Sequence, residues 1–393
     1  MTQVSLKNDW LATCPKGLEL LLSEELIAMG AEGVKETVAA VYFNGSLELA
    51  YRACLWSRLA NRILMPLHSF MLKESDDLYR ECNDIPWEQH FSSVQSIAID
   101  FIGTSRLVDN TMYGSQRVKD AIVDRIRRIE GERPSVDTKN PDIRIQVRQH
   151  KGRVSVSLDI SGESLHRRGY RTGQGSAPIK ENLAVALLLR AGWPAMAAEG
   201  GALLDPMCGS GTFLIEAAML ATNYPPNIKR SNFSFKNWND FDLDLFVMIT
   251  KSVQSKIKPY NNKISGFDKS PSAISKCNQN IINAGLDDII SISKEDFFRS
   301  KKNNDNFLHL VFNPPYGERL RIDIESFYKK IGDKLKTDYS NSNAWFITSS
   351  IEALKYVGLR PSRKIKLFNG KLESRLAKYE IYSGSKKAKK NIY

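Results

Sequence analysis

The segment Ala202–Ala218 constrains the fold more than any other part of the chain. A short apolar run ends at Asp205-Pro206, a glycine turn follows at Cys208–Thr212, and an apolar helical stretch comes next. This pattern predicts the first strand and helix of a parallel α/β sheet. A dinucleotide-binding fingerprint would need a third glycine where Leu214 stands, and a Walker loop would need Gly-Lys-Ser/Thr. The turn therefore favours neither of these nucleotide sites.

A second apolar run, Leu310–Phe312, stops at Asn313-Pro314-Pro315-Tyr316. Proline lacks an N–H and has a fixed φ, and Pro314 favours an extended backbone at Asn313, so the corner is stiff. It is expected at the carboxyl end of a strand, where open α/β sheets bind ligands. The Asn313 amide oxygen and the Pro314 carbonyl would each accept one N–H of an aromatic amine, with Tyr316 stacked on the ring. A proline-rich turn that only caps a strand would have the same sequence.

Both motifs resemble those of methyltransferases. The turn resembles motif I of S-adenosylmethionine-dependent enzymes, and the corner resembles motif IV of amino-methyltransferases, which act on adenine N6, cytosine N4, guanine N2 or the glutamine amide. The resemblance implies a catalytic corner of Asn313, Pro314, Pro315 and Tyr316. It also implies S-adenosyl-L-methionine as cofactor, held at Asp205, Pro206, Cys208, Gly209, Ser210, Gly211 and Thr212.

Two later predicted strands end in acidic residues. Ile264–Asp268 is expected to place Asp268 beside the ribose hydroxyls of the cofactor. Ile289–Asp296 is expected to place Asp296 beside the adenine amino group, with Phe297 packed on the ring. Strand-end aspartates are also common turn residues, so the prediction rests on the series. The long insertion between Asn223 and Asn262 is expected to cover the cofactor or the RNA.

Composition bounds the class of protein. A chain of 393 residues should hold two or three domains. Its net charge of +12 lies in the middle and C-terminal parts, which indicates a polyanionic partner or a merely basic surface. The five cysteines form no Cys-x-x-Cys pair, so we expect reduced thiols, no disulfide and no metal site. Without a signal-peptide core or a long apolar run, the protein is expected to be cytoplasmic and not in a membrane.

The front of the chain is predicted to be α+β. Helices are expected at residues 17–30 and about 46–64, with Arg52, Arg58 and Arg62 on a solvated face of the second. A strand at 96–101 and a helix at 113–128 precede a hairpin with one polar face at 143–158. This order, with Pro141–Ile145, resembles a THUMP domain, which implies binding of structured RNA.

The linker at residues 162–182 is glycine-rich and basic. Its cations and Tyr170 would follow a nucleic-acid backbone and stack on a base, although a plain flexible connector fits too. The candidate RNA-binding residues are Lys119 and Arg125 on the helix, and Arg167, Arg168, Arg171 and Lys180 in the linker.

Over its whole length the chain resembles the bacterial 23S rRNA guanine-N2 methyltransferase family with an N-terminal THUMP domain. The matching stretches are Leu165–Arg171, Ala177–Glu181, Asp205–Thr212 and Asn313–Leu320. The resemblance implies N2-methylation of a guanosine in domain V of 23S rRNA, as RNA or as a large-subunit precursor. Many members carry a second methyltransferase at the C-terminus, which would here be absent or removed.

The expected fold is an α+β N-terminal and THUMP region followed by a class I (Rossmann-like) α/β methyltransferase domain. The expected boundaries are 1–60 for a ferredoxin-like part, 61–165 for THUMP, 166–182 for the linker and 183–393 for the catalytic domain. Its doubly wound sheet should have an antiparallel C-terminal edge. Two rival functions stay open: an adenine-N6 methyltransferase on DNA or RNA, and a ribosome-assembly factor with incidental methylation. The target nucleotide and the oligomeric state are left open.

Overall fold

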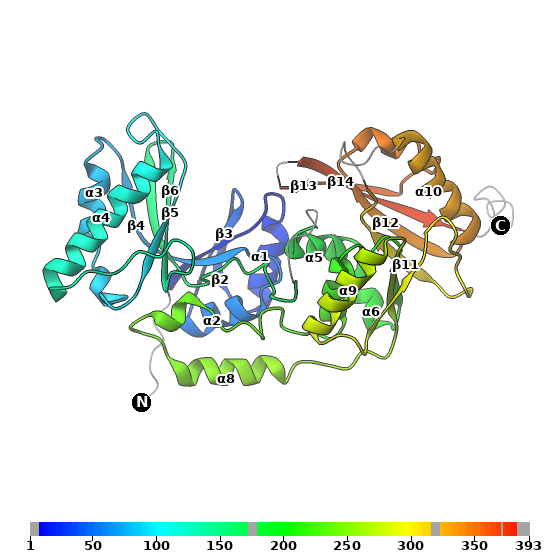
Figure 1. Ribbon diagram of the computed structural model, residues 1–393, viewed down its shortest axis with the longest axis horizontal. Coiled ribbons are helices and arrows are strands. Elements are labelled where there is room, and N and C mark those ends of the chain that lie inside the picture. The colour runs from blue at the N-terminus through cyan, green and yellow to red at the C-terminus, as the bar shows by residue number, and fades with distance from the viewer. Residues whose placement is uncertain (1–7, 172–178, 316–322, 371, 383–393) are drawn as a thin grey trace. The chain divides into compact units, whose positions relative to one another are not determined.

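The computed structural model describes residues 8–171, 179–315, 323–370 and 372–382, and the chain forms two compact units (Figure 1). Unit 1 comprises Met1–Cys14, Glu19–Leu165 and Asn227–Val253. Unit 2 comprises Pro15–Leu18, His166–Pro226 and Gln254–Tyr393. In the described part of the chain, the helices lack the length and apolar character needed to cross a membrane.

Unit 1 is built on a seven-stranded sheet of order β2-β3-β1-β4-β7-β6-β5. Strands β5 and β6 run parallel, and the other neighbours are antiparallel. The strands are β1 (Asn8–Thr13), β2 (Glu32–Thr37), β3 (Ala40–Gly45), β4 (Arg62–Met71), β5 (Ile97–Ile102), β6 (Ile143–His150) and β7 (Arg153–Asp159). The helices are α1 (Glu19–Ala28), α2 (Leu47–Trp56), α3 (Asp77–Asp84), η1 (Trp87–Gln89) and α4 (Thr111–Glu130).

The helix expected at residues 46–64 is shorter than predicted. It ends at Trp56, because the half-buried Glu25 carboxylate accepts hydrogen bonds from the Ser57 hydroxyl and the Arg58 amide (2.6 and 2.7 Å). The chain then enters β4 at Arg62. The expectation that Arg58 and Arg62 share a solvated helical face is therefore wrong.

Strand β6 confirms the expected hairpin with one polar face. Its residues alternate between buried and more exposed positions, with Ile143, Ile145, Val147 and Gln149 on the buried side. Helix α4 packs on the neighbouring β5, where a Cβ on Gly114 would lie 2.8 Å from the Phe101 ring. The opposite, polar face of β6 becomes fully exposed only towards its outer end, at Arg148 and His150.

The insertion between Asn223 and Asn262 belongs largely to unit 1. It contains η2 (Ser234–Asn237) and α8 (Leu243–Gln254). Phe235 of η2 stacks on Tyr51 of α2, with ring centroids 4.3 Å apart. Asn227 donates to the Cys54 carbonyl at 3.1 Å, and Ser234 donates to the Asp142 carbonyl at 2.7 Å. Residues 227–241 pack aromatic side chains into the core of unit 1, and the expected cover over the cofactor or the RNA stays a prediction.

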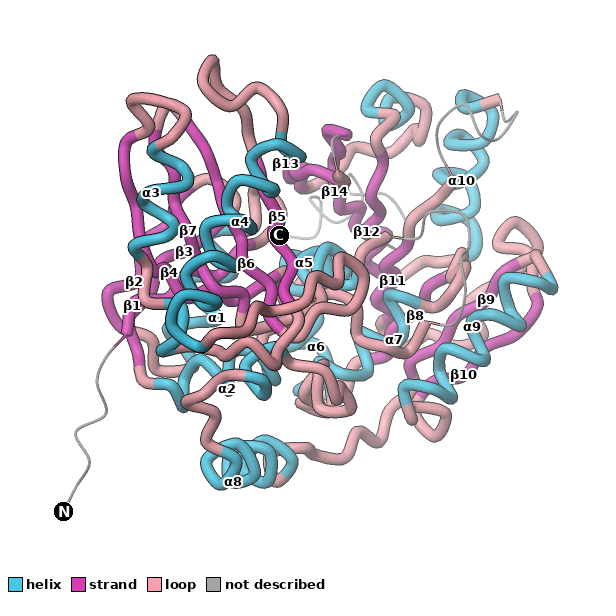
Figure 2. The backbone as a smooth tube through the Cα atoms, turned by 60° about the vertical axis from the view of Figure 1, so that its left-hand side comes forward, coloured by secondary structure: helices cyan, strands magenta, loops and turns pink. Residues whose placement is uncertain are grey.

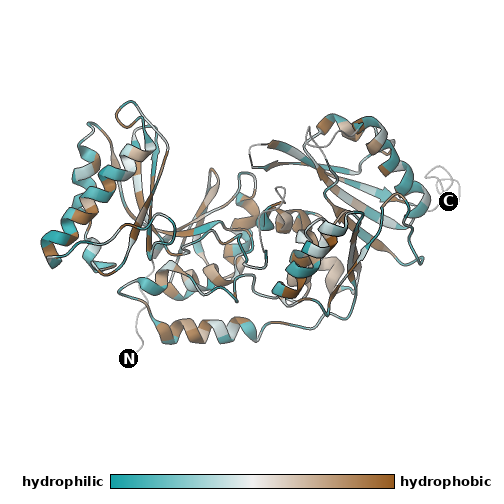
Figure 3. Cartoon of the chain, in the orientation of Figure 1, coloured by the Kyte–Doolittle hydropathy of each residue, from teal (hydrophilic) through white to brown (hydrophobic). Residues whose placement is uncertain are grey.

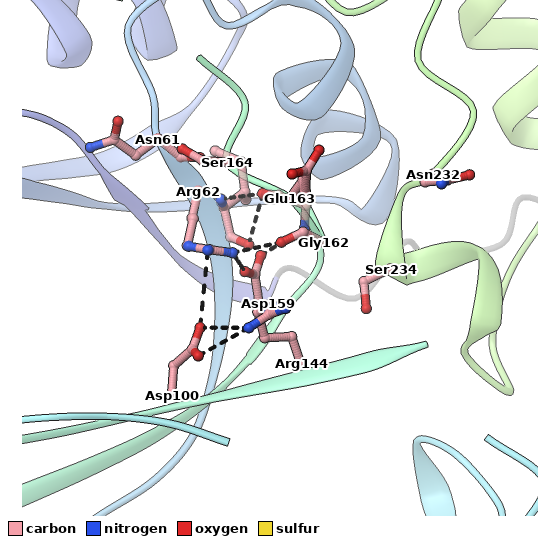
Figure 4. Close-up of polar contacts among 12 residues, drawn as sticks. Asn61, Arg62, Asp100, Arg144, Asp159, Gly162, Glu163, Ser164, Asn232 and Ser234 are labelled. Carbon is pink, nitrogen blue, oxygen red and sulfur yellow. Dashed lines mark hydrogen bonds and ion pairs between the residues drawn. The ribbon is translucent and has the colours of Figure 1, made fainter. Parts of the chain in front are cut away.

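A polar network ties β4, β5, β6 and β7 together (Figure 4). Arg62 pairs with the buried Asp159 and donates to the Gly162 carbonyl at 2.6 Å. Arg144 donates to both carboxylate oxygens of Asp100 at 3.0 and 3.1 Å. In the same unit Arg230, from the insertion, donates to the Glu163 carbonyl at 2.6 Å. The insertion is therefore bonded to the turn that follows β7.

Unit 2 contains a seven-stranded sheet of order β10-β9-β8-β11-β12-β14-β13. The first five strands are parallel, and β14 and β13 form an antiparallel edge. The strands are β8 (Ala202–Asp205), β9 (Ile264–Asp268), β10 (Ile290–Lys294), β11 (Leu308–Phe312), β12 (Ser342–Thr348), β13 (Arg363–Asn369) and β14 (Leu372–Ile381). This arrangement confirms the expected class I sheet with its antiparallel C-terminal edge.

Helices cover both faces of this sheet. One apolar cluster joins the sheet to α5 (Glu181–Arg190), α6 (Trp193–Ala198), α7 (Thr212–Ala221) and α9 (Pro271–Ala284). A second cluster joins it to α10 (Ile324–Asp338) and η3 (Ile351–Lys355). Figure 2 shows α9 running beside β9 and β10. In Figure 3 hydrophilic and hydrophobic residues alternate along α4 and α10, as expected for helices with one buried side.

Candidate active site

The glycine turn links β8 to α7 in unit 2. Gly209 and Gly211 have φ of 54° and 83°, a region that suits glycine. A Cβ on Gly211 would lie 2.5 Å from the Cys277 sulfur, so this position has no room for a side chain. Beside Gly209, in contrast, a Cβ would meet no atom within 4 Å. The turn is thus packed tightly at one glycine and open at the other.

Three side chains from different segments of unit 2 hold three residues of this turn. The Asp268 carboxylate at the end of β9 accepts from the Gly209 amide at 3.1 Å. Asn280 of α9 donates to the Ser210 carbonyl at 2.9 Å. Arg171 donates to the Thr212 hydroxyl at 2.7 Å. The predicted cofactor residues Gly209, Ser210 and Thr212 are therefore each held by a hydrogen bond to a side chain from another segment of unit 2.

Asp205 ends β8 beneath the turn. Its side chain is buried and accepts from the Met207 amide at 3.1 Å. Burial raises the pKa of Asp205 to about 8, and the nearby Asp268 carboxylate adds to this effect, while the Met207 amide opposes it. Pro206 and Cys208 are also buried, and the Cys208 amide donates to the Phe267 carbonyl at 3.0 Å. All five cysteines are buried and free.

The strand order places the predicted acidic residues along one edge. Strands β10, β9, β8 and β11 are consecutive neighbours, and all four run in the same direction. Asp268 and Asp205 end two of these strands, and Asp296 lies shortly after β10. Asp296 accepts from the Phe298 amide at 3.0 Å and is half-buried.

Phe297 is not available to a ligand in the way the sequence suggested. Its ring is buried in the core, with centroids 5.9 Å from Phe312 and 5.6 Å from Tyr339. The ring therefore has other aromatic rings as neighbours in this core. The prediction that Phe297 packs on the adenine of a cofactor is wrong, because burial among these rings is the more favourable use of the side chain.

The predicted catalytic corner follows β11, the strand next to β8. Asn313 is half-buried, and its Oδ1 atom is buried without a hydrogen-bond partner among the described residues. Pro314 is buried and Pro315 is half-buried. Tyr316 lies outside the described residues. The corner thus presents a buried acceptor at the sheet edge that also carries the glycine turn.

The structure corrects most of the predicted RNA contacts. Arg168 has a fully buried side chain, 3.6 Å from the Glu216 carboxylate. Arg171 is held by Thr212, the Ile179 carbonyl and Glu181. A guanidinium engaged in this way is not presented to a phosphate. Arg167 and Lys180 are exposed, so their predicted role is compatible with their position.

The predicted contacts on α4 are also paired. Arg125 forms a bidentate pair with Glu88 at 2.7 and 2.8 Å, and Lys119 lies 2.5 Å from Asp120. Tyr170, expected to stack on a base, is buried and donates to Glu216 at 3.2 Å. Arg125 and Tyr170 serve the fold, because their partner carboxylates already engage the charge and the hydroxyl. The role of the partly exposed Lys119 stays a prediction.

Three basic residues that the sequence analysis did not select lie at the outer end of the β6–β7 hairpin. Arg148, Lys151 and Arg153 are exposed, and no ion pair of theirs occurs within the described ranges. The period-two alternation of residues 143–153 was the available signal, because it puts Arg148 on the polar face.

Comparison with known proteins assigns a family to the rear of the chain first. The family model of the RMKL-like methyltransferase domain matches residues 168–378. The chain belongs to this methyltransferase family. Two further models match the front of the chain: the RlmL ferredoxin-like domain at residues 9–64 and the THUMP domain at residues 73–159. The recognition of a THUMP-containing methyltransferase from the sequence is confirmed.

A curated relative from Cellvibrio japonicus, named ribosomal RNA large subunit methyltransferase K/L, is 44% identical over 385 residues, which cover 95% of this chain and 51% of the relative. The chain spans about half the length of the curated relatives that it matches.

Two solved structures have the same architecture. SMU.472, a candidate methyltransferase solved with SAH, has a TM-score of 0.85 and 27% identity, covering 96% of this chain and 99% of that chain. A protein from Listeria monocytogenes, described as a predicted N6-adenine-specific DNA methylase, has a TM-score of 0.83 and 28% identity, covering 96% of this chain and 97% of that chain.

Proposed function

We propose that this chain transfers a methyl group from S-adenosylmethionine to the exocyclic N2 amine of a guanosine in 23S rRNA. The main support is the buried, unpartnered Oδ1 of Asn313, which follows the strand next to β8 and its glycine turn. A buried acceptor without a donor is costly to a folded protein. An amine donor from a substrate would remove that cost.

The residues of the sheet edge fit the cofactor. The open space beside Gly209 allows close approach to the backbone, and Asp205 is a buried carboxyl group suited to an ammonium. Asp268 would accept from the ribose hydroxyls, and Asp296 from the adenine amino group; each carboxylate keeps a further acceptor lone pair beyond its amide bonds. S-adenosylmethionine, when bound, supplies an electrophilic methyl group.

The corner would act on the target amine by positioning and electrostatics. Asn313 Oδ1 and the Pro314 carbonyl would accept the two amine hydrogens, which draws the nitrogen towards tetrahedral geometry and frees its lone pair. As the nitrogen becomes positively charged, the same two oxygens stabilise it more strongly. Guanine N2 is stacked in folded RNA, so the base must be turned out of its stack. We assign Tyr316 the stacking role proposed from the sequence.

The substrate is proposed to be RNA of the large ribosomal subunit. The curated relatives are named for that RNA, and residues 73–159 match the THUMP model. We assign Arg148, Lys151 and Arg153 to phosphate contacts, together with the exposed Arg167 and Lys180. A ribosomal substrate would place the enzyme in the bacterial cytoplasm.

Adenine-N6 methylation is the second candidate. The Listeria monocytogenes structure is named for that activity, and an Asn-Pro-Pro-Tyr corner suits either the adenine N6 or the guanine N2 amine. The relative named for ribosomal RNA is closer, at 44% against 28% identity. The guanine-N2 assignment is therefore the one that we propose.

Nucleoside analysis tests the proposal. The chain is incubated with deuteromethyl S-adenosylmethionine and 23S rRNA from cells that lack the endogenous enzyme, and the digested nucleosides are measured by mass spectrometry. Labelled N2-methylguanosine is expected from the unaltered chain and from Asn303→Ala, an exposed control. Labelled N6-methyladenosine, or no label in RNA, would overturn the proposal.

A further inference from the structure

Arg171 connects the residues around the start of α5 with the start of α7 in unit 2. Its Nη2 donates to the Ile179 carbonyl and to the Thr212 hydroxyl, both at 2.7 Å. Its Nε lies 3.3 Å from the carboxylate of Glu181, the first residue of α5. One guanidinium therefore connects the segment before α5, the start of α5 and the start of α7.

The contact with Thr212 lies at the end of the glycine turn, where the helix that follows has no capping side chain. Thr212 is buried and begins α7, directly after Gly211. Gly211 is the N-cap residue and makes no side-chain cap hydrogen bond, since glycine has no side chain. The usual stabilisation of a helix N-terminus by a capping side chain is thus missing here. Arg171 does not replace the cap, because a guanidinium only donates; it holds the turn through the Thr212 hydroxyl.

The direction of this hydrogen bond also orients the Thr212 hydroxyl. A guanidinium has five N–H donors and no acceptor. The Thr212 hydroxyl oxygen accepts from Arg171, so this bond does not use the hydroxyl proton. Arg171 therefore leaves the proton of the buried Thr212 hydroxyl available for donation at the end of the glycine turn.

We propose that Arg171 is a positioning residue for cofactor binding: through Thr212 it holds the glycine turn in its binding conformation and presents the Thr212 hydroxyl as a donor. This inference rests on the proposed function, because it assumes that the turn binds S-adenosylmethionine. Arg171 is thereby assigned to the cofactor site and not to RNA.

A double-mutant cycle tests whether Arg171 acts through Thr212. Arg171→Met, Thr212→Val and the double variant are compared in a Glu181→Gln background, because Arg171→Met alone would leave the buried Glu181 carboxylate unpaired. Titration calorimetry measures the Kd for S-adenosylhomocysteine. Each single change is expected to raise the Kd about tenfold, as for one lost charge-assisted hydrogen bond. The double variant should be no weaker than the weaker single variant, because both changes remove the same contact.

Arg360→Met is the matched control, since Arg360 is an exposed arginine of unit 2 to which no binding role is assigned. It should leave the Kd unchanged. A second readout needs no ligand: in Arg171→Met, hydrogen exchange should speed up at the amides of residues 209–213 and stay unchanged in α10. An unchanged Kd, or additive effects of about a hundredfold, would overturn the inference. Faster exchange throughout unit 2 would also overturn it, because it would show a general structural role.

The same titration separates this inference from the proposed function. If the unaltered chain binds no S-adenosylhomocysteine, both fail. If it binds and the cycle is additive, the cofactor assignment stands and the role of Arg171 is rejected.

Discussion

Strands β7 of unit 1 and β8 of unit 2 both end in a buried aspartate, but only one of the two is paired. Burial raises the pKa of both carboxyl groups. At Asp159 the Arg62 guanidinium opposes this rise, whereas at Asp205 the Asp268 carboxylate increases it. Asp159 belongs to the network that joins four strands, and Asp205 lies under the glycine turn.

The difference separates structural from functional polar groups. A buried charge with a partner stabilises a particular fold only while both members are present. A buried acid or amide without a complementary partner destabilises the folded chain, and a ligand that supplies the complementary group removes this destabilisation. The Asn313 Oδ1 falls in the second class, while Asp205 has an amide donor but no pairing cation among the described residues; both lie at the carboxyl edge of the parallel sheet.

The largest expected effect concerns Asp205 and pH. Because its folded pKa is about 8, above the unfolded value, the ligand-free folded chain retains a proton that the unfolded chain has lost. This group's contribution to stability is thus fully present below about pH 4 and falls as pH rises to about 8, by up to roughly 5 kcal/mol. Asp205→Asn should remove this slope. Urea unfolding at pH 5, 6.5 and 8 checks it, and parallel slopes for the two proteins would contradict it.

Asn313→Ala should lower the rate of methyl transfer about 10²–10³-fold, equivalent to about 2.7–4 kcal/mol, by analogy with loss of one preorganised hydrogen-bonding group. Its oxygen matters most as the amine gains charge, so kcat should fall while the Kd values for S-adenosylhomocysteine and RNA change little. Single-turnover assays measure the rate. Methylation at close to the original rate would show that this unpaired amide is not part of the chemistry.

On the paired side of the comparison, Asp159→Ala should destabilise unit 1 by about 3 kcal/mol, because it leaves the Arg62 guanidinium without its closest carboxylate. Its effect on S-adenosylhomocysteine affinity should be negligible at a temperature where unit 1 is folded. Chemical denaturation measures the loss.

Glu352→Ala is the control: it breaks the exposed Lys355–Glu352 pair and should change stability very little. Equal effects of the two variants would show that burial does not distinguish these pairs.

The smallest expected effect is on RNA affinity. Replacing Arg148, Lys151 and Arg153 together with alanine should weaken binding of a 23S rRNA fragment about tenfold and flatten its salt dependence, because fewer counterions are released. The melting temperature and the S-adenosylhomocysteine Kd should not change. Arg125→Ala, whose guanidinium is paired with Glu88, should leave the salt slope as it is. The reverse result would place the RNA on α4, as the sequence suggested.

The sequence alone was sufficient for the catalytic unit's architecture. The apolar runs, the glycine turn and the proline corner are local patterns, and parallel strands bring their carboxyl ends to one edge. Asp205, Asp268, Asp296 and Asn313 could therefore be predicted to share that edge. The polar face of the β6–β7 hairpin was equally predictable, because period-two alternation is a local signal.

Only the tertiary structure decided which polar and aromatic groups are already engaged. Arg168 and Glu216 are far apart in the sequence and meet in the core of unit 2, and Phe297 is surrounded by rings from β11 and the end of α10. The insertion likewise joins unit 1, where Phe235 finds Tyr51. Charge and aromatic content are properties of a residue, but pairing and burial depend on contacts between distant segments. No local pattern encodes those contacts.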